Sequence, residues 1–276
     1  MPVKISKYAL EFSYRVKPNL YQYFFNLFNL YFRYPITIKV IKSQILVSDK
    51  YTDYKIFNSR PQRLLRYSNG IKHLCDSMLL SYHLKELVFP DNAIIIDIGA
   101  NVGEVSYALL RKNSTLQIIA IEPDPKDFND LNNNVLSSRS VLINSAVADF
   151  SGKIQMFLNN NFGDTSVFDT ENSVGTMISP CASLDDIYSR YINNRKVFLV
   201  KCEAEGLEPE VLSGGKLALA NTIYVCCDTG PERAGEYTFE QTHKILTDLN
   251  FRLIKGDKSR NLYLNNAFQV DSDLRL

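Results

Sequence analysis

Short apolar runs alternate with amphipathic stretches from residue 93 to residue 265. A short apolar run without polar residues at alternate positions indicates a strand that is buried on both faces of a sheet. Five such strands are predicted, at residues 93–98, 116–121, 140–146, 196–202 and 222–227. The stretches between them favour helices, among them residues 102–110, 207–220 and 239–249. With a last pair of strands at 251–254 and 261–265, the pattern predicts an α/β fold with a doubly wound, mostly parallel seven-stranded sheet.

The first 88 residues follow a different pattern. The predicted elements are an aromatic helix at 20–34, a β-hairpin at 36–47, and helices at 60–67 and 71–87. The hairpin is inferred from apolar residues at alternate positions on both sides of Lys42-Ser43-Gln44. A turn at Pro90-Asp91-Asn92 then precedes the first buried strand. We therefore expect an N-terminal helical and hairpin extension at 1–88 and a cofactor-binding domain at 89–276.

The predicted helix at 20–34 is rich in Tyr and Phe. Its polar residues recur at helical spacing and form one narrow stripe, which consists of Asn19, Gln22, Asn26, Asn29 and Arg33. The rest of its surface is a wide apolar arc. Three interpretations stay open: a helix docked on its own catalytic domain, a homodimer surface, or a peripheral membrane anchor.

The strand at 93–98 leads into a glycine-containing turn and a helix, which is the arrangement of a nucleotide-type cofactor site. A dinucleotide-binding loop normally has the pattern G-x-G-x-x-G, and here Asn101 replaces its middle glycine. Asp97 puts a carboxylate at the end of the strand, where it repels a pyrophosphate and suits a ligand that carries an ammonium and a sulfonium. The loop therefore favours S-adenosylmethionine (SAM) over NAD. We expect Asp97→Asn to reduce SAM affinity more than thermal stability.

The ends of the next two strands predict contacts to an adenosine. Glu122 follows the second strand, and a carboxylate there can accept hydrogen bonds from both ribose hydroxyls. The alternative for Glu122 is a charge at the start of the next helix. Asp149 follows the third strand and is a candidate for the exocyclic amine of adenine, with a plain turn aspartate as the alternative.

Residues 159–180 form a long polar stretch between a strand at 153–158 and a helix that begins after Ser183. We interpret this stretch as a loop, and loops of such length are usually functional lids or mobile segments. Ser183, with Asp186 three positions later, is typical of a helix cap, which is the role we expect for it.

Acidic residues follow the fourth and fifth strands. Glu203, Glu205 and Gly206 come after the fourth strand. Asp228 comes after the fifth. This edge of an open sheet faces the ligand, so Glu203 and Asp228 are the candidate catalytic residues and Glu205 is a candidate cofactor ligand. The acids can act as a general base, clamp an ammonium group, bind a hard cation or simply open a helix as solvated charges. We expect no metal, because neither a histidine nor a D-x-D spacing supports one, and we expect His243 to be structural.

Composition narrows the range of functions. The chain has 276 residues, 45% of them apolar, and a formal net charge of +1. This length can bury one large core plus an appendage, and the near-zero charge argues against nucleic acid as a partner. Five cysteines without C-x-x-C spacing predict a reducing, cytoplasmic setting. Residues 1–10 have no apolar signal region, and no run of about 18 apolar residues predicts a membrane span.

Three motifs, in this order, resemble those of the FkbM family of SAM-dependent methyltransferases. The first, D-I-G-A-N-x-G, comprises Asp97, Gly99, Ala100, Asn101 and Gly103. The second, I-E-P-x-P-x-x-F, comprises Glu122, Pro123 and Phe128. The third, V-K-x-E-x-E-G-x-E, comprises Lys201, Glu205, Gly206 and Glu208, with Leu212 and Gly214 after it. Asp228 together with Gly230-Pro231-Glu232-Arg233 resembles a fifth-strand motif of one subgroup. Glu203 stands where the family has an aspartate, and Cys202 stands where it has an aliphatic residue.

The resemblance implies a class I methyltransferase (Rossmann-like) fold and, most often, O-methylation of a hydroxyl on a sugar, a glycan or a small metabolite. In-line transfer from an activated sulfonium depends on positioning, and a hydroxyl acceptor also benefits from a base such as Glu203 or Asp228. Two other functions stay open: an NAD-dependent oxidoreductase, and a catalytically inactive SAM-binding module that interacts through its aromatic helix. We expect a cytoplasmic protein, with the inner membrane face as the alternative location.

Overall fold

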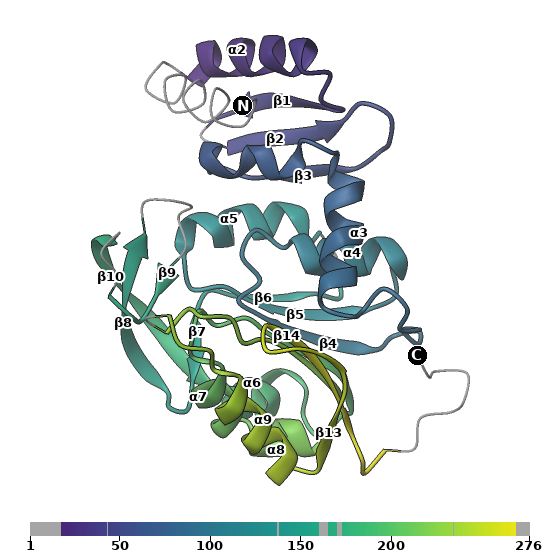
Figure 1. Ribbon diagram of the computed structural model, residues 1–276, viewed down its shortest axis with the longest axis vertical. Helices are drawn as coiled ribbons and strands as arrows, with labels where there is room; N and C mark the ends of the chain where they lie inside the picture. Colours follow the sequence, from purple (N-terminus) through teal and green to yellow (C-terminus); the bar gives the residue numbers. More distant parts are fainter. Residues whose placement is uncertain are drawn as a thin grey trace.

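The computed structural model describes residues 18–42, 44–136, 138–159, 165–169, 173–233 and 235–268. Its largest feature is a seven-stranded sheet with the order β13-β14-β12-β11-β4-β5-β6 (Figure 1). The strands are β4 (Ile94–Ile98), β5 (Gln117–Ile121), β6 (Val141–Ile143), β11 (Val197–Cys202), β12 (Thr222–Asp228), β13 (Phe251–Gly256) and β14 (Arg260–Asn265). β14 runs antiparallel to β12 and β13, and the other neighbouring pairs are parallel. The predicted doubly wound, mostly parallel sheet is confirmed.

Helices cover both faces of this sheet, as strands with continuous apolar runs require. One face carries α4 (Glu104–Lys112) and α5 (Pro125–Asn134), and the other carries α6 (Leu184–Tyr191), α7 (Glu208–Ser213), α8 (Lys216–Ala220) and α9 (Phe239–Asp248) (Figure 1). Successive residues of β4 point to opposite faces. Ile95 packs in the hydrophobic cluster that contains Leu109 of α4, and Ile96 packs in the cluster that contains Leu246 of α9. The central strand is therefore buried from both sides.

The single helix predicted at 207–220 is wrong, because the chain forms two helices, α7 and α8, interrupted at Gly214 and Gly215. A Cβ atom on Gly214 would lie 2.5 Å from the carbonyl oxygen of Ala148, and one on Gly215 would lie 2.6 Å from Cδ2 of Leu184. The two glycines let the chain pass close to neighbouring segments at this point.

A four-stranded second sheet has the order β7-β10-β8-β9. Its strands are β7 (Ala146–Ala148), β8 (Gly152–Asn159), β9 (Thr165–Ser166) and β10 (Ser173–Ser183). Two predictions are wrong here: the third strand at 140–146 divides between β6 and β7, and the loop at 159–180 contains β9 and most of β10. Polar residues along β10 hide it from a search for apolar runs, although it pairs antiparallel with β8. Residues 160–164 and 170–172 lie outside the described residues. Ser183 caps α6 as predicted, with its Oγ accepting a hydrogen bond from the Asp186 N–H.

The N-terminal part contains α2 (Pro18–Tyr31), β1 (Ile36–Ile41), β2 (Gln44–Asp49), β3 (Lys55–Phe57), the 3₁₀ helix η1 (Pro61–Tyr67) and α3 (Ile71–Ser81). The predicted hairpin is confirmed as β1 and β2, whereas β3 is too short for its pattern to be recognised. α3 is shorter than the predicted helix at 71–87 and is followed by His83 with a left-handed φ of 59°. One hydrophobic cluster contains both Val47 of β2 and Ile95 of β4, and the domain boundary at residue 88 stays a prediction.

α2 packs on β1 through Gln22, Asn26 and Asn29 of its polar stripe. Tyr21 and Phe25 of its apolar arc are buried, and the rest of the arc faces outward. β1 is an edge strand of the sheet β1-β2-β3. Oδ1 of Asn26 accepts a hydrogen bond from the Ile38 N–H, and its Nδ2 donates to the Ile38 carbonyl, both at 2.9 Å. Gln22 accepts one hydrogen bond from the Val40 N–H, and Asn29 donates one to the Ile36 carbonyl. The helix thus satisfies polar groups that an edge strand leaves without a neighbouring strand. It docks on the N-terminal sheet rather than on the catalytic domain.

Two sequence features can be checked directly. All five cysteines are buried free thiols, and burial raises the pKa of the Cys75 thiol to about 12. Within the described ranges, no helix has the length and apolar character that crossing a membrane requires. Residues 1–17, which include the stretch without an apolar signal region, lie outside those ranges.

Candidate active site

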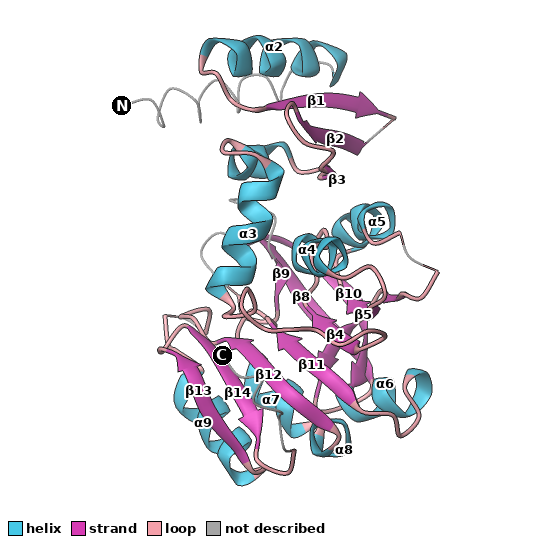
Figure 2. Cartoon of the chain, turned by 90° about the vertical axis from the view of Figure 1, so that its right-hand side faces the viewer, coloured by secondary structure: helices cyan, strands magenta, loops and turns pink. Residues whose placement is uncertain are grey.

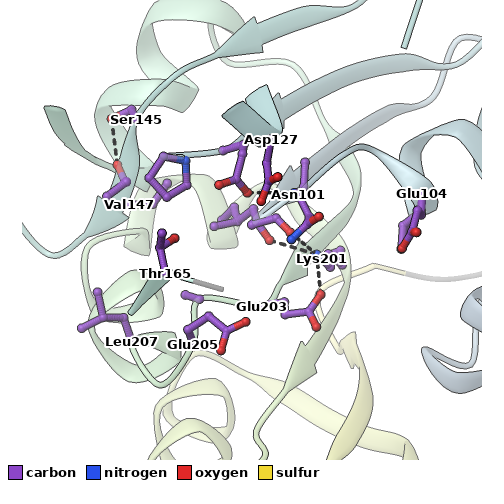
Figure 3. Close-up of a pocket in the computed structure, with 18 of the residues that line it drawn as sticks. Asn101, Glu104, Asp127, Ser145, Val147, Thr165, Lys201, Glu203, Glu205 and Leu207 are labelled. Atoms are coloured by element: carbon purple, nitrogen blue, oxygen red, sulfur yellow. Dashed lines mark hydrogen bonds and ion pairs between the residues drawn. The ribbon is translucent and has the colours of Figure 1, made fainter. Parts of the chain in front are cut away.

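One pocket lies beyond the carboxyl ends of β4, β5 and β11, the edge at which open α/β sheets bind ligands (Figure 3). Arg66 of η1 and Met78 of α3 contribute to its walls, so the N-terminal extension helps to form it. Five predicted site residues line the pocket: Gly99, Asn101, Glu122, Glu203 and Glu205. The other four predicted residues are not among its lining residues: Asp97, Gly103, Asp149 and Asp228.

The loop after β4 has a backbone conformation that favours glycine and asparagine. Gly99 and Asn101 have φ angles of 66° and 54°, in the left-handed region. The Asn101 N–H donates to Oε2 of Glu122 at 2.8 Å. Its Oδ1 accepts a hydrogen bond from Nη1 of Arg63 at 2.6 Å. Asn101 therefore keeps a glycine-like backbone while its side chain ties the loop to the N-terminal extension.

Gly99→Ala is expected to lower both stability and SAM affinity. A Cβ atom at this position would lie 1.8 Å from the carbonyl oxygen of Glu203, so the loop or the end of β11 must move. Gly235→Ala is the matched control, because Gly235 also has a positive φ (89°) but nothing within 4 Å of its added Cβ. The control should cost only the left-handed strain of about 1–2 kcal/mol. Chemical unfolding and SAM calorimetry measure both effects, and equal losses in the two variants would show that the close approach at Gly99 is unimportant.

Two residues predicted to contact the cofactor, Gly103 and Asp149, are not among those that line the pocket. Gly103 is the N-cap of α4 with φ 89°, and a Cβ there would lie 2.7 Å from Cδ1 of Leu131, so it lets α4 pack against α5. Asp149 is exposed. Because the third strand divides, Ser145 to Val147 line the pocket instead. The break between β6 and β7 thus brings residues 145–147 to the pocket in place of Asp149.

Glu122 lies at the end of β5, with only 5% of its surface exposed. Its Oε1 accepts a hydrogen bond from the Asp124 N–H and its Oε2 accepts one from the Asn101 N–H, both at 2.8 Å. Burial and the neighbouring Asp127 carboxylate raise the pKa of Glu122 to about 8. Each carboxylate oxygen has a further lone pair, and the residue borders the pocket. A ligand that donates hydroxyl groups to Glu122 would stabilise its charged form.

Asp97 is not among the residues that line the pocket, so a role at the positive end of the ligand would act through the residues that it contacts. It is fully buried, with Oδ1 at 3.1 Å from Nζ of Lys201 and Oδ2 accepting a hydrogen bond from Oγ of Ser106 at 2.6 Å. Lys201 also donates to the Gly99 carbonyl at 2.8 Å. Burial by itself lowers the pKa of Lys201, but the carboxylates of Asp97 and Glu203 outweigh it and raise that pKa above the ordinary lysine value. Asp97 therefore fixes the position of the Lys201 ammonium group, and Lys201 in turn fixes the loop after β4 through the Gly99 carbonyl.

Glu203 lies between two cations at the pocket. Its Oε2 is 3.0 Å from Nζ of Lys201, and its Oε1 is 3.7 Å from Nη2 of Arg260 (Figure 3 marks the first contact). Burial raises the pKa of Glu203, but the charge of Lys201, the Tyr82 hydroxyl and Arg260 together lower it below the ordinary glutamate value. Its side chain is 28% exposed. Glu203 is therefore an ionised carboxylate that a ligand can reach.

Asp228 is connected to the pocket through Arg260, which lines it. Nε of Arg260 donates to Oδ2 of Asp228 at 2.8 Å, and the guanidinium lies 4.3 Å from the centre of the Tyr82 ring. Burial and the charge of Glu203 raise the pKa of Asp228. The position of Asp228 suits a residue that orients Arg260. Sequence reasoning missed Arg260 because it lies on β14, outside the three motifs.

Buried Glu208 shapes the turn after β11. Its Oε1 accepts hydrogen bonds from the N–H groups of Ala204 at 2.8 Å and Gly206 at 3.2 Å. Arg233 donates from Nε to the Gly206 carbonyl at 3.0 Å. These contacts fix the turn in which Glu205 has a φ of 51° and borders the pocket. Glu208 and Arg233 thus support the site without lining it.

A row of arginines joins the N-terminal extension to the cofactor loop. Arg60, Arg63 and Arg66, the arginine row, recur every three residues, which is the repeat of a 3₁₀ helix. Their ion pairs join Arg60 to Asp124 and Asp127 (both 2.6 Å), Arg63 to Asp127 (3.0 Å) and Arg66 to Glu104 (2.8 Å). Sequence reasoning did not find them, because their partners lie on other elements, although the spacing of three was visible.

No three His, Cys, Asp or Glu side chains in the described parts of the chain are grouped so as to hold a metal ion. His243 has its Nδ1 at 3.2 Å from the Tyr263 hydroxyl, and its ring stacks on Phe239 with 5.4 Å between centroids. It is not among the residues that line the pocket, which agrees with the structural role predicted for it.

The sheet order, with antiparallel β14 between β12 and β13, and the acidic pocket at its carboxyl edge define a Rossmann-like, class I methyltransferase. A model of the methyltransferase FkbM domain family matches residues 97–253, more than half of the chain. The chain therefore belongs to the FkbM methyltransferase family, and its cofactor is SAM. It is also similar to the 2-O-methyltransferase NoeI of Sinorhizobium fredii (strain NBRC 101917 / NGR234), with 24% identity over 193 residues that cover 64% of this chain and 79% of NoeI.

Two solved structures show more distant likeness. A fibrillarin/Nop5p complex gives a TM-score of 0.43 at 14% identity and covers 82% of this chain and 95% of that one. The Methanococcus jannaschii fibrillarin pre-rRNA processing protein gives a TM-score of 0.43 at 12% identity and covers 83% and 97%. Neither likeness bears on the acceptor.

Proposed function

We propose that this protein transfers the methyl group of SAM to a hydroxyl group of a sugar, a glycan or a small metabolite. The observation that carries the proposal is Glu203, an accessible ionised carboxylate at the edge of the cofactor pocket. The printed name of the similar NoeI, a 2-O-methyltransferase, supports the same acceptor chemistry.

The residues around the pocket fit SAM. Glu122 is a buried carboxylate that borders the pocket and can accept hydrogen bonds from ribose hydroxyls. Glu205 adds a second carboxylate, which suits an ammonium or a sulfonium. The close approach of Gly99 to the Glu203 backbone leaves the loop no room for a Cβ. We assign the ribose to Glu122 and the positively charged end to Glu205.

When bound, SAM supplies a methyl group on a positively charged sulfur. The acceptor oxygen forms a bond to the methyl carbon as the carbon–sulfur bond breaks, and the electron pair of that bond stays on sulfur. Glu203 accepts the hydroxyl proton, and Lys201 and Arg260 keep Glu203 charged until it does so. Because the pKa of Glu203 is lowered, it takes the proton only as the new bond to the methyl carbon makes the hydroxyl acidic.

The test uses SAM with a labelled methyl group and a panel of monosaccharides, oligosaccharides and small alcohols. We expect label on a hydroxyl oxygen of at least one acceptor, located by NMR. Calorimetry should show binding of SAM and no binding of NAD. SAM binding without transfer to any acceptor would favour the inactive interaction module. Transfer only to an amine or a carboxylate group of these compounds would overturn the methylation of a hydroxyl group.

SAM affinity is expected to rise with pH between about 6 and 8, by up to about tenfold per pH unit, because the charged form of Glu122 accepts the ribose hydrogen bonds. Its pKa of about 8 lies above the ordinary 4.5, so the folded protein keeps a proton that the unfolded chain loses. The stability of the ligand-free protein should therefore fall as pH rises from 4.5 to about 8. Glu122→Gln should flatten both trends relative to the wild type. Parallel pH profiles for the two proteins would rule out this role.

A further inference from the structure

We infer that the outer face of α2 is a docking surface for a bilayer that contains anionic lipids. The outer face consists of Leu20, Tyr23, Phe24, Leu27, Leu30 and Tyr31, all of them exposed. These positions recur at intervals of three and four, so they form one continuous side of the helix. Exposure ranges from 46% for Phe24 to 82% for Tyr31. A contiguous exposed apolar patch of this kind marks an interaction site.

The polar side of α2 is already occupied within the chain. Oε1 of Gln22 accepts a hydrogen bond from the Val40 N–H at 2.7 Å, and Nδ2 of Asn29 donates to the Ile36 carbonyl at 3.2 Å. Tyr21 is buried on the same side. A helix that faces only water presents polar residues outward. In α2, Gln22, Asn26 and Asn29 face β1 instead, so the outward position of the apolar side calls for an apolar partner.

The charge near the outer face selects the partner. Residues 18–57 contain five exposed cations, Arg33, Lys39, Lys42, Lys50 and Lys55, and only two acids. Asp49 accepts a hydrogen bond from the Ile71 N–H at 2.6 Å, and Asp53 pairs with Arg111 at 2.6 Å. Both acids therefore contact the following part of the chain, whereas Lys39 lies on β1, on which α2 packs, and Lys50 donates to the carbonyl of Tyr34, three residues after the end of α2. Anionic headgroups attract such cations while acyl chains receive the apolar side chains.

A second copy of this chain fits the same surface less well. In a two-fold dimer the outer face would meet itself, and the cations that flank it would face one another. Tyr23 and Tyr31 combine an apolar ring with a polar tip, which suits the boundary between headgroups and acyl chains. α2 lies at the end of the molecule opposite α8 and α9 (Figures 1 and 2). A flat bilayer can therefore reach the helix.

The experiment is co-sedimentation of the full chain with vesicles of phosphatidylcholine alone or of phosphatidylcholine mixed equally with phosphatidylglycerol. We expect binding only to the anionic vesicles, and weaker binding at high salt, because the Debye length falls from about 10 Å at 0.1 M to about 3 Å at 1 M. Leu30→Glu should reduce the partition coefficient about tenfold or more by removing an inserted side chain and adding a repelled charge. Leu136→Glu, the same change at an exposed leucine elsewhere, should bind as the wild type does.

Leu30 and Leu136 are exposed and lie outside the pocket, so we expect both variants to fold and to bind SAM. Circular dichroism and SAM calorimetry check this expectation. Wild-type protein that stays in the supernatant with anionic vesicles would overturn the inference. So would equal binding of Leu30→Glu and wild type. If sedimentation velocity shows a dimer that Leu30→Glu dissociates, the partner is a second copy and the membrane assignment is wrong. None of these readouts depends on methyl transfer.

Discussion

Glu203→Gln is expected to lower the rate of methyl transfer by about 10²–10⁴-fold, the usual contribution of a positioned base. The amide keeps the shape of the side chain but cannot take the acceptor proton, and it loses the attraction of Lys201 at 3.0 Å. SAM affinity should change little, because Glu122 and Glu205 remain. Single-turnover rates with labelled SAM, together with calorimetry, separate the two effects.

The pH profile gives an independent check. Because the pKa of Glu203 is lowered, the acid limb of the wild-type rate profile should lie below the usual glutamate range. Asp228→Asn is the matched control, since it removes a charge that reaches the pocket through Arg260, and its loss of rate should be smaller. A Glu203→Gln enzyme that turns over like wild type would leave catalysis to positioning alone. A large loss of SAM affinity would make Glu203 a cofactor ligand.

Asp97→Asn is expected to lower the free energy of unfolding by about 3–5 kcal/mol, the cost of breaking a buried ion pair by removing one partner. Asp97 is fully buried and Lys201 is 1% exposed, so the buried ammonium would keep only Glu203, at 3.0 Å, as an ionic partner. From the buried ion pair we thus expect a large loss of stability, whereas the sequence alone led us to expect a larger loss of SAM affinity. Denaturant unfolding monitored by circular dichroism measures the loss.

Ser106→Ala is the control for Asp97→Asn. It removes the hydrogen bond at 2.6 Å to Oδ2 of Asp97 but keeps the ion pair with Lys201. A hydrogen bond to a charged group contributes about 1.5–3 kcal/mol, so this variant should lose less stability. If Asp97→Asn unfolds normally but binds SAM poorly, the carboxylate serves the ligand after all.

The fold could be predicted from the sequence wherever a strand is buried from both sides. The apolar run of β4 and the loop after it identified the cofactor site, because a parallel sheet exposes its carboxyl edge to ligands. β10 escaped notice because polar residues interrupt it. α2 shows a further limit: an amphipathic pattern identifies two sides of a helix but not which side faces the protein.

The candidate site was predicted less completely, for reasons of geometry. Asp97 and Lys201 are direct neighbours across β4 and β11, but a cross-strand pair cannot be recognised before the register is known. Arg260 comes from an antiparallel strand that carries no motif. Glu122 and Glu203 were found because each directly follows a strand at the carboxyl edge, where sequence position alone places a residue near the ligand.

The arginine row makes the two parts of the chain difficult to exchange. Asp127 is 1% exposed and Glu104 is 4% exposed, and both depend on arginines that precede residue 88 for their counter-charges. A fragment starting at residue 89 would keep the cofactor loop but leave these carboxylates without their partners. A foreign N-terminal segment would need cations at the same three-residue spacing to replace the native one. Any recombinant chimera of this enzyme should therefore place its junction before residue 60, so that the arginines and their acids come from one parent.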